Sequence, residues 1–474
     1  MPLILGTNSI KDTGYDVANS LRFDDGSSDY LSRTTGTPTS DKIGTLSFWV
    51  KRTRLGSPDN YIFNNYIDAS NYSMLRFDGA DRLEFFSFND PNYLSLRTNR
   101  LFRDTSAWYH IVFKVDMTQA TSSNRLKFYV NGVEETSFSS TEYGTQNQVC
   151  NLFTSSASGN NRIGTDETST YHIDGYMAEV CLIDGQALDP TSFGEFDEDS
   201  PTIWKPKDVS GLTFGTNGFY LDFQNSGSLG ADVSGNGNNF TVNNLTSVDQ
   251  SLDTCTNNFA TLNSLNSWGG AVLSEGNLRL TSTATAFDHT SATIHMNSGK
   301  WYMEFNAVAT SGGSGVACFL AGTGEFQNDQ TSWISSGDGS FGIGMNGYKI
   351  TDGVEEGSNS FSAVSSGDIV QIAYDSDSGK AWFGINNTWL ASGNPSTGAN
   401  PYFTSSKLQN NDVVLKLITY TSSNTSVANF GQDSSFAGTK TKQSNQDSNS
   451  QGNFFYSPPT DFLALNTTNL SEYG

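Results

Sequence analysis

The 474-residue sequence has few cysteines, few histidines and no long apolar run. Its four cysteines lie far apart without a CxxC pair, and no histidine stands near them at ligand spacing, which argues against a zinc site. Sparse thiols are typical of proteins that fold in a reducing cytosol. We therefore expect buried free thiols, with a bridge between Cys150 and Cys181 as the alternative. No stretch reaches the roughly 18 apolar residues of a membrane span, so membrane insertion is not expected.

Basic residues are also scarce. The chain has 26 Lys and Arg against 49 Asp and Glu, which gives a formal net charge of −23. A field of this sign repels phosphate backbones and anionic lipids, so no nucleic-acid partner is expected. Residues 1–6 (MPLILG) lack the basic region and the long apolar run of a signal peptide. If the protein works outside a cell, we therefore expect it to leave by a route other than ordinary secretion.

Aromatic residues, by contrast, are abundant. The chain has 32 Phe, 19 Tyr and 8 Trp, which supply large apolar areas for a core. In residues 108–116 and 367–375, apolar side chains alternate with polar ones up to a turn, and a second alternating run follows in residues 125–133 and 380–386. Such alternation is typical of strands with one face on a core. The sequence predicts an all-β protein built from two antiparallel β-sandwiches.

Composition divides the chain into five expected parts. They are an N-terminal anchoring arm (1–20), a first sandwich (21–200), an Asn- and Gly-rich connector (201–263), a second sandwich (264–430), and a polar linker with a C-terminal apolar segment (431–474). The connector has the residues of turns and hairpins. Residues 431–452 have almost nothing to bury, which indicates a loop or linker. The apolar stretch that begins at Phe454 is expected to pack back on a domain or a partner.

Six short motifs follow one another along the first predicted sandwich. They are residues 21–26 (LRFDDG), 48–50 (FWV), 108–110 (WYH), 128–132 (FYVNG), 163–164 (IG) and 173–176 (IDGY). In this order they resemble the laminin-G-like domains of the concanavalin A-like fold. The resemblance implies a jelly-roll sandwich that binds its partners through loops on a rigid frame.

The second predicted sandwich carries another set of motifs. They are residues 299–304 (GKWYME), 341–343 (FGI), 367–370 (GDIV) and 381–386 (AWFGIN). This set resembles SPRY domains, which are also concanavalin A-like jelly rolls. The sequence is therefore expected to hold two such sandwiches joined by a turn-rich connector.

Further motifs extend the resemblance to nearly the whole chain. They are residues 1–6, 255–263 (CTNNFATLN) and 429–433 (NFGQD). With the two sandwiches they resemble virion proteins of tailed phages that infect marine bacteria. The resemblance implies a tail fibre or spike component that assembles in the host cytoplasm and is released by lysis. A capsid decoration or head fibre with purely structural contacts is the alternative.

The same resemblance implies partners. The N-terminal arm would dock onto a tail or adaptor protein, and loops of one or both sandwiches would bind a glycan or a protein on the host surface. We expect a homo-oligomer, because many copies per particle turn weak single contacts into avidity.

The laminin-G resemblance also implies a calcium ion near the rim of one sheet, held by acidic residues of the opening and closing strands. Asp24, Asp29 and Asp174 are the matching residues. The family often has an Asp two residues after the aromatic of its closing motif, and this chain has Ala178 there. Solvated turn carboxylates are therefore the alternative to a calcium site. No other cofactor is expected.

Sugar contacts need aromatic side chains in loops, where a flat ring covers the apolar face of a pyranose and polar groups take its hydroxyls. Trp333 and Tyr348 lie in Gly- and Ser-rich surroundings between expected strands. They are the predicted sugar-binding residues. The alternative is that each caps the sandwich core.

No catalytic residues are expected. A polysaccharide depolymerase on this fold would carry two carboxylates on one strand. The nearest approach is Glu195 to Asp199 (EFDED), but Ser200 stands where the pattern needs its closing Glu, and the run lies in an acidic connection. The four histidines are scattered and no GxSxG motif accompanies them. The sequence therefore predicts a binding protein.

Overall fold

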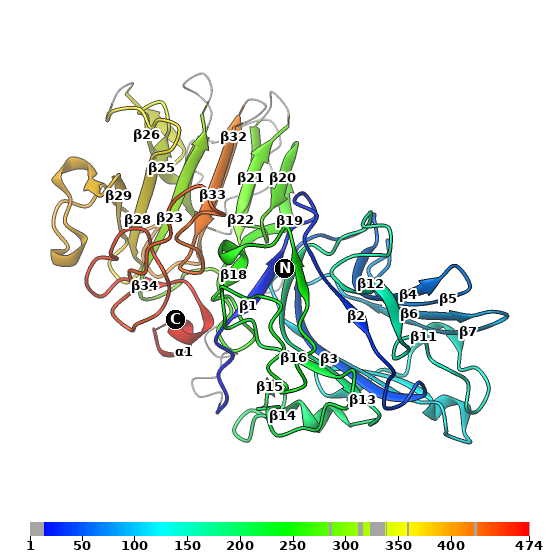
Figure 1. Ribbon diagram of the computed structural model, residues 1–474. Helices are drawn as coiled ribbons and strands as arrows, with labels where there is room; N and C mark the ends of the chain where they lie inside the picture. The colour runs from blue at the N-terminus through cyan, green and yellow to red at the C-terminus, as the bar shows by residue number, and fades with distance from the viewer. Residues whose placement is uncertain are drawn as a thin grey trace. The chain divides into compact units, whose positions relative to one another are not determined.

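The computed structural model describes residues 14–283, 287–310, 316–322, 337, 339–357, 360–420 and 424–473. In this part of the chain strands dominate, and the residues fall into two compact units (Figure 1). The first unit covers residues 14–256 and the second covers residues 257–473. The predicted all-β class with antiparallel β-sandwiches is confirmed. Among the described residues, no helix combines the length and the apolar character needed to cross a membrane.

The first unit contains two eight-stranded sheets. One follows the order β10-β9-β8-β3-β13-β1-β18, with β16 added beside β13, and we call it the front sheet. Its strands are β1 (Ser20–Phe23), β3 (Ile43–Arg52), β8 (Tyr109–Asp116), β9 (Leu126–Val130), β10 (Val133–Glu134), β13 (Gly175–Asp184), β16 (Phe219–Leu221) and β18 (Gln250–Ser251).

The other sheet, the back sheet, follows the order β11-β7-β6-β5-β4-β12-β2-β17. Its strands are β2 (Tyr30–Thr35), β4 (Asn60–Asp68), β5 (Asn71–Phe77), β6 (Arg82–Asn89), β7 (Asn92–Leu101), β11 (Phe138–Glu142), β12 (Ser156–Ile163) and β17 (Thr241–Asn243). Alternate residues of the two sheets meet in one apolar core, for example Phe48 and Phe113 from the front sheet with Phe85 and Leu96 from the back sheet.

The front sheet is buried on its outer face as well. In β13, Met177 and Leu182 belong to the core, whereas Cys181 and Ile183 pack on the opposite side against Phe193 and further apolar residues. Residues 15–17, 188–214 and 252–256 supply the cover, and we call them the first covering layer. This layer holds a two-stranded sheet of β14 (Gly194–Phe196) and β15 (Trp204–Pro206).

The second unit has the same plan, with a seven-stranded and a nine-stranded sheet. The seven-stranded sheet holds β19 (Leu262–Trp268), β22 (Phe287–Ala292), β24 (Val316–Gly322), β25 (Phe341–Gly344), β26 (Lys349–Thr351), β27 (Val354–Glu356) and β32 (Val413–Tyr420). The nine-stranded sheet holds β20 (Ala271–Ser274), β21 (Arg279–Ser282), β23 (Lys300–Ala309), β28 (Ile369–Asp375), β29 (Lys380–Ile385), β30 (Thr388–Trp389), β31 (Phe403–Thr404), β33 (Thr425–Asn429) and β34 (Leu463–Ala464).

The outer face of the nine-stranded sheet is also covered. Residues 436–462, the second covering layer, place Phe436, Phe455 and Tyr456 against apolar residues of that face. The chain then adds β34 parallel to β23 and ends in the helix α1 (Thr467–Tyr473). Short 3-10 turns complete the described elements: Ser122–Asn124, Pro190–Ser192, Ser247–Asp249, Leu390–Ser392 and Pro395–Thr397.

These layers differ from the expected division of the chain. Most of the expected connector, residues 201–263, belongs to the first unit, where β16, β17 and β18 extend its sheets. The expected linker, residues 431–452, packs in the second unit, since residues 432–436 are buried. Of the expected anchoring arm, residues 1–13 lie outside the described residues, and Val17 is buried in the first unit.

The expectation of free thiols is confirmed. All four are free; Cys150, Cys181 and Cys318 are buried and Cys255 is half-buried. Burial raises the pKa of the Cys150 thiol to about 12, so this thiol is unreactive at neutral pH.

Candidate functional site

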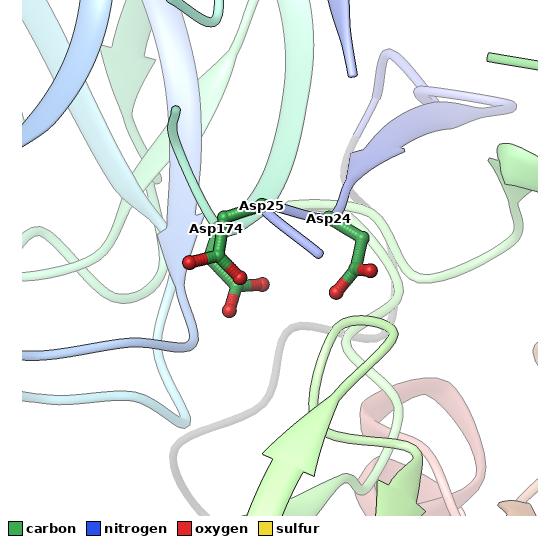
Figure 2. A group of neighbouring side chains, drawn as sticks. All are labelled: Asp24, Asp25 and Asp174. Atoms are coloured by element: carbon green, nitrogen blue, oxygen red, sulfur yellow. The ribbon is translucent and has the colours of Figure 1, made fainter. Parts of the chain in front are cut away.

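Three carboxylates meet where the first strand of the first unit ends. Asp24 and Asp25 follow β1, and Asp174 precedes β13. Because Phe23 pairs with Gly175 across these antiparallel strands, the ends of β1 and β13 lie side by side. One oxygen from each carboxylate lies within 4.8 Å of the others (Figure 2). We call these three residues the acidic cluster.

A tight turn holds the first two carboxylates. The carboxylate of Asp29 accepts a hydrogen bond from the Asp24 N–H at 3.0 Å, and the Asp24 carbonyl accepts one from the Asp29 N–H at 3.3 Å. Burial raises the pKa of Asp29 to about 7. Asp29 therefore closes the turn, and it lies outside the group of three.

Burial and mutual repulsion act on the acidic cluster. Asp174 is 3% exposed, and burial, followed by the charges of Asp24 and Asp25, holds its pKa well above the usual range. The Thr53 hydroxyl donates to Asp174 at 2.9 Å, and Arg54 forms an ion pair with Asp25. Three carboxylates this close together repel one another, so a cation placed among them would stabilise the site.

The acidic cluster fits a calcium ion. All three side chains offer hard oxygen ligands, which Ca²⁺ prefers, and backbone carbonyls lie in the same turn. Of the predicted ligands, the structure brings Asp24 and Asp174 together and leaves Asp29 as a turn residue. Asp25 was missed, although its adjacency to Asp24 in residues 21–26 is a signal that could have found it.

Residue 178, where the sequence has Ala instead of the Asp frequent in laminin-G-like domains, has a structural role. Ala178 is fully buried under the first covering layer. The next residue, Glu179, has a φ of 51° and lies at an irregularity of the pairing between β13 and β3. Its carboxylate accepts hydrogen bonds from the hydroxyls of Tyr220 at 2.7 Å and Tyr15 at 3.2 Å. Glu179 thus anchors the covering layer to the front sheet.

A second feature of the first unit lies on the outer face of the back sheet. Tyr66 of β4 pairs with Tyr72 of β5, Tyr72 pairs with Phe88 of β6, and Phe88 pairs with Tyr93 of β7. These four residues, the aromatic row, run across four neighbouring strands (Figure 1). At roughly 4.8 Å between strands, the row is about 14 Å long.

The rings of the aromatic row form a continuous surface. The ring centroids of Tyr66 and Tyr72 lie 6.4 Å apart, and those of Tyr72 and Phe88 lie 5.8 Å apart. Phe86, on the same strand face as Phe88, contacts both Tyr72 and Tyr93 at 5.9 Å. Tyr93 is 46% exposed and the other four aromatic side chains are half-buried.

Charged side chains lie on the same face, four residues further along the strands. Along β5, β6 and β7, alternation places Arg76, Glu84 and Arg97 on the side of Tyr72, Phe88 and Tyr93. Arg76 forms an ion pair with Glu84 at 2.8 Å, and Arg97 lies 3.7 Å from the same carboxylate. Flat rings beside hydrogen-bonding groups are the surface chemistry that recognises sugars. Sequence reasoning missed the row because it depends on strand register.

Sugar binding by Trp333 and Tyr348 stays a prediction. Trp333 lies outside the described residues. Tyr348 is half-buried in the hairpin between β25 and β26, where its carbonyl accepts a hydrogen bond from the Gly344 N–H at 2.9 Å.

The acidic run considered for catalysis forms a hairpin in the first covering layer. Glu195 lies in β14, and Asp197 accepts hydrogen bonds from the N–H groups of Asp199 and Ser200. Lys205 of β15 lies 3.2 Å from Asp197 and 3.9 Å from Glu195. These carboxylates shape a turn and pair with a lysine.

Comparisons with known proteins place the first unit. Residues 25–191 match the family model of the concanavalin A-like lectin/glucanases superfamily. The comparison with curated proteins finds no match.

Three solved structures show weak likenesses. The SPRY domain of human HERC1 is 14% identical, with a TM-score of 0.28, and the match covers 35% of this chain and 96% of that one. A heptameric SAP-like pentraxin from Limulus polyphemus is 16% identical, with a TM-score of 0.25 and coverages of 37% and 79%. A Bacteroides ovatus protein provisionally described as carbohydrate-binding is 17% identical, with a TM-score of 0.33 and coverages of 48% and 59%.

The family match and the two packed sheets together identify the first unit as a concanavalin A-like β-sandwich.

Proposed function

We propose that this chain is a non-enzymatic attachment protein of a tailed-phage particle, a tail fibre or spike component that binds a carbohydrate or a protein on the host surface. The observation that carries the binding role is the aromatic row of Tyr66, Tyr72, Phe88 and Tyr93 on the concanavalin A-like unit. The location in a virion rests on the resemblance of the whole chain to phage virion proteins.

The row favours an extended glycan. Pyranose rings have an apolar face that stacks on aromatic rings, and a surface about 14 Å long accommodates more than one sugar of a chain. Four residues further along the same strand faces, the Arg97 side chain is 32% exposed and offers N–H donors for hydroxyl groups.

The acidic cluster would hold a calcium ion through Asp24, Asp25 and Asp174. A bound calcium ion supplies positive charge that fixes neighbouring backbone and attracts oxygen ligands. Without it, Thr53 and Arg54 hold two of the carboxylates in place, so the turn after β1 is already shaped for oxygen coordination.

The test is competition with phage adsorption. Purified full-length protein is added to host cells before the phage, and we expect adsorption to fall as the protein concentration rises. Tyr93→Ala should raise the concentration needed by about tenfold, because it removes an exposed ring from the row. Leu101→Ala is the matched control, since Leu101 lies on the same strand and is 45% exposed.

Two results would contradict the proposal and favour another function. Undiminished adsorption and no cell binding would favour the capsid decoration or head fibre. Reducing ends released from host polysaccharide would indicate a depolymerase.

A further inference from the structure

The second unit contains a pocket of about 420 Å³ that the aromatic row and the acidic cluster do not involve. Its walls come from five stretches: the start of β23, the turn after β28, the second covering layer, β34 and the end of α1. The lining includes Lys300, Asp377, Asn449, Asp461, Leu463 and Tyr473. A volume of this size lies within the range of small-molecule sites.

Hydrogen bonds among the walls hold the pocket open in one shape. The carboxylate of Asp377 accepts from the Gly299 N–H at 3.0 Å, and the Ser448 hydroxyl accepts from the Asp461 N–H at 3.1 Å. The Asn449 side chain donates to Asn469 at 3.0 Å. Because the Asn449 bond joins the second covering layer to α1, the site forms only once the C-terminal part of the chain has packed.

The polar groups of the lining are mixed in kind. Carboxylates of Asp377 and Asp461 accept hydrogen bonds, the ammonium group of Lys300 donates them, and hydroxyl and amide groups do both. A sugar hydroxyl both donates and accepts, so this mixture matches it. Two carboxylates beside one ammonium group disfavour phosphate, sulfate and acidic sugars.

An apolar patch completes the lining. Leu463 and Tyr473 lie in the same pocket, and the Tyr473 side chain is 47% exposed. A tyrosine and a leucine among carboxylate and amide groups match a ligand with one apolar face and a rim of hydroxyls. We propose that this pocket binds a single neutral sugar residue, a hexose or an N-acetylhexosamine, as a second saccharide site on the chain. The inference deepens the proposed function, on which it rests for the source of the sugar.

The two sites would differ in what they recognise. The aromatic row is a flat surface that suits several units of a chain, whereas the pocket is a hollow whose size suits one unit, such as a terminal or branching sugar.

The test is saturation-transfer-difference NMR on the full-length protein with single sugars: glucose, galactose, mannose, N-acetylglucosamine and N-acetylgalactosamine, with N-acetylneuraminic acid as the acidic comparison. We expect transfer to at least one neutral sugar and little to the acidic one. Tyr473→Ala should abolish the transfer, and Asp461→Asn should weaken binding about tenfold by removing a charge-assisted acceptor.

Matched controls separate the pocket from general damage. Val354→Ala removes a 44% exposed apolar side chain from the same unit, and Glu355→Gln removes an exposed carboxylate next to it; neither lines the pocket. Both should leave the transfer unchanged. Equal transfer in wild type and Tyr473→Ala, or no transfer from any neutral sugar, would overturn the inference.

The failure of this inference and that of the proposed function are distinguishable. If wild type blocks phage adsorption but no neutral sugar binds, the pocket is excluded as a sugar site and the attachment role stands. If a sugar binds in the pocket but adsorption is unaffected, the pocket inference is supported and the attachment role fails.

Discussion

The two units attach their covering layers with different residues. In each, one sheet of the sandwich is covered on its outer face by a layer of chain that is poor in apolar residues. The first covering layer is fastened by the ion pair of Lys51 with Asp253, in which both side chains are fully buried. The second is fastened by the buried carboxylate of Glu304 on β23, which accepts hydrogen bonds from the N–H groups of Phe455 and Tyr456, both at 2.8 Å.

The difference concerns where the compensating charge comes from. Asp253 is paired with a cation and also accepts from the Trp108 indole N–H at 3.1 Å. Glu304 relies on neutral donors, which are the two N–H groups, the Tyr302 hydroxyl and the Asn429 amide. Burial raises the pKa of Glu304 to about 7, since neutral donors do not fully replace water around a charge. A polar cover can therefore be attached by an ion pair or by a network.

The largest effect should follow from breaking the ion pair. Asp253→Ala leaves the Lys51 ammonium group without its buried counter-charge, and we expect a loss of about 3–5 kcal/mol in the free energy of unfolding. Urea denaturation measures it. Lys51→Met combined with Asp253→Leu should recover most of the loss, and Lys42→Met, at an exposed pair with Asp41, should change stability by less than about 1 kcal/mol. An equally mild effect of Asp253→Ala would contradict the anchoring role.

Removal of the network anchor should cost somewhat less. Glu304→Ala leaves four donors without their acceptor, and we expect a loss of about 3 kcal/mol and faster proteolysis within residues 436–462. Urea denaturation and limited proteolysis measure the two effects. Glu355→Ala, at an exposed site of the same unit, is the control. Unchanged proteolysis would show that the layer is held by its apolar contacts alone.

Calcium should distinguish the units, because within the described residues the acidic cluster is the group of three carboxylates placed to hold a metal ion, and it lies in the first unit. At a concentration 100 times Kd, calcium should stabilise the first unit by about 2.7 kcal/mol, seen as a rise in its thermal unfolding temperature. Asp174→Asn should remove the rise, while Asp199→Asn, an exposed carboxylate elsewhere in the unit, should not. An equal calcium response in both variants would exclude the acidic cluster.

The smallest effect concerns pH. Burial raises the pKa of Glu179 from 4.5 to about 7. A raised pKa in the folded state means that the contribution to stability is fully present below pH 4.5 and is lost as the pH rises through about 7. The stability of wild type relative to Glu179→Gln should therefore fall by roughly 2 kcal/mol across this window. Urea denaturation at several pH values tests this. A stability difference that does not change with pH would show that folding does not raise the pKa of Glu179.

The sequence predicted the strands of the sandwiches because their signal is local. Alternation in residues 108–116 and 367–375 corresponds to β8 and β28, and the runs after them correspond to β9 and β29. One face of a strand on a core leaves a period of two in the sequence, whatever the strand pairs with. The fold class could be read from this pattern alone.

The covering layers could not be predicted in this way. Asp447 shows why: its carboxylate accepts hydrogen bonds from the N–H groups of Asn449, Gln451 and Ala464 and from the Asn469 side chain. Such a segment is ordered by polar side chains that bind backbone, with a few aromatic anchors, and a count of apolar residues underestimates it.

The sites show the same limit. The acidic cluster was partly predictable, because Asp24 and Asp174 stand in motifs of the strands that open and close the unit. The aromatic row was not, because Tyr66, Tyr72, Phe88 and Tyr93 become neighbours only through the register of four strands. Register depends on turns and bulges that the sequence does not specify locally.

Residues 188–214 and 436–462 are packed layers of the first and the second unit. Hydrogen exchange of backbone amides in the full-length protein, followed by mass spectrometry, tests it most directly. We expect amides that are hydrogen-bonded within these segments, such as those of Phe193 and Phe454, to exchange far more slowly than amides of an unstructured chain. Exchange throughout both segments at the rate of an unstructured peptide would contradict it.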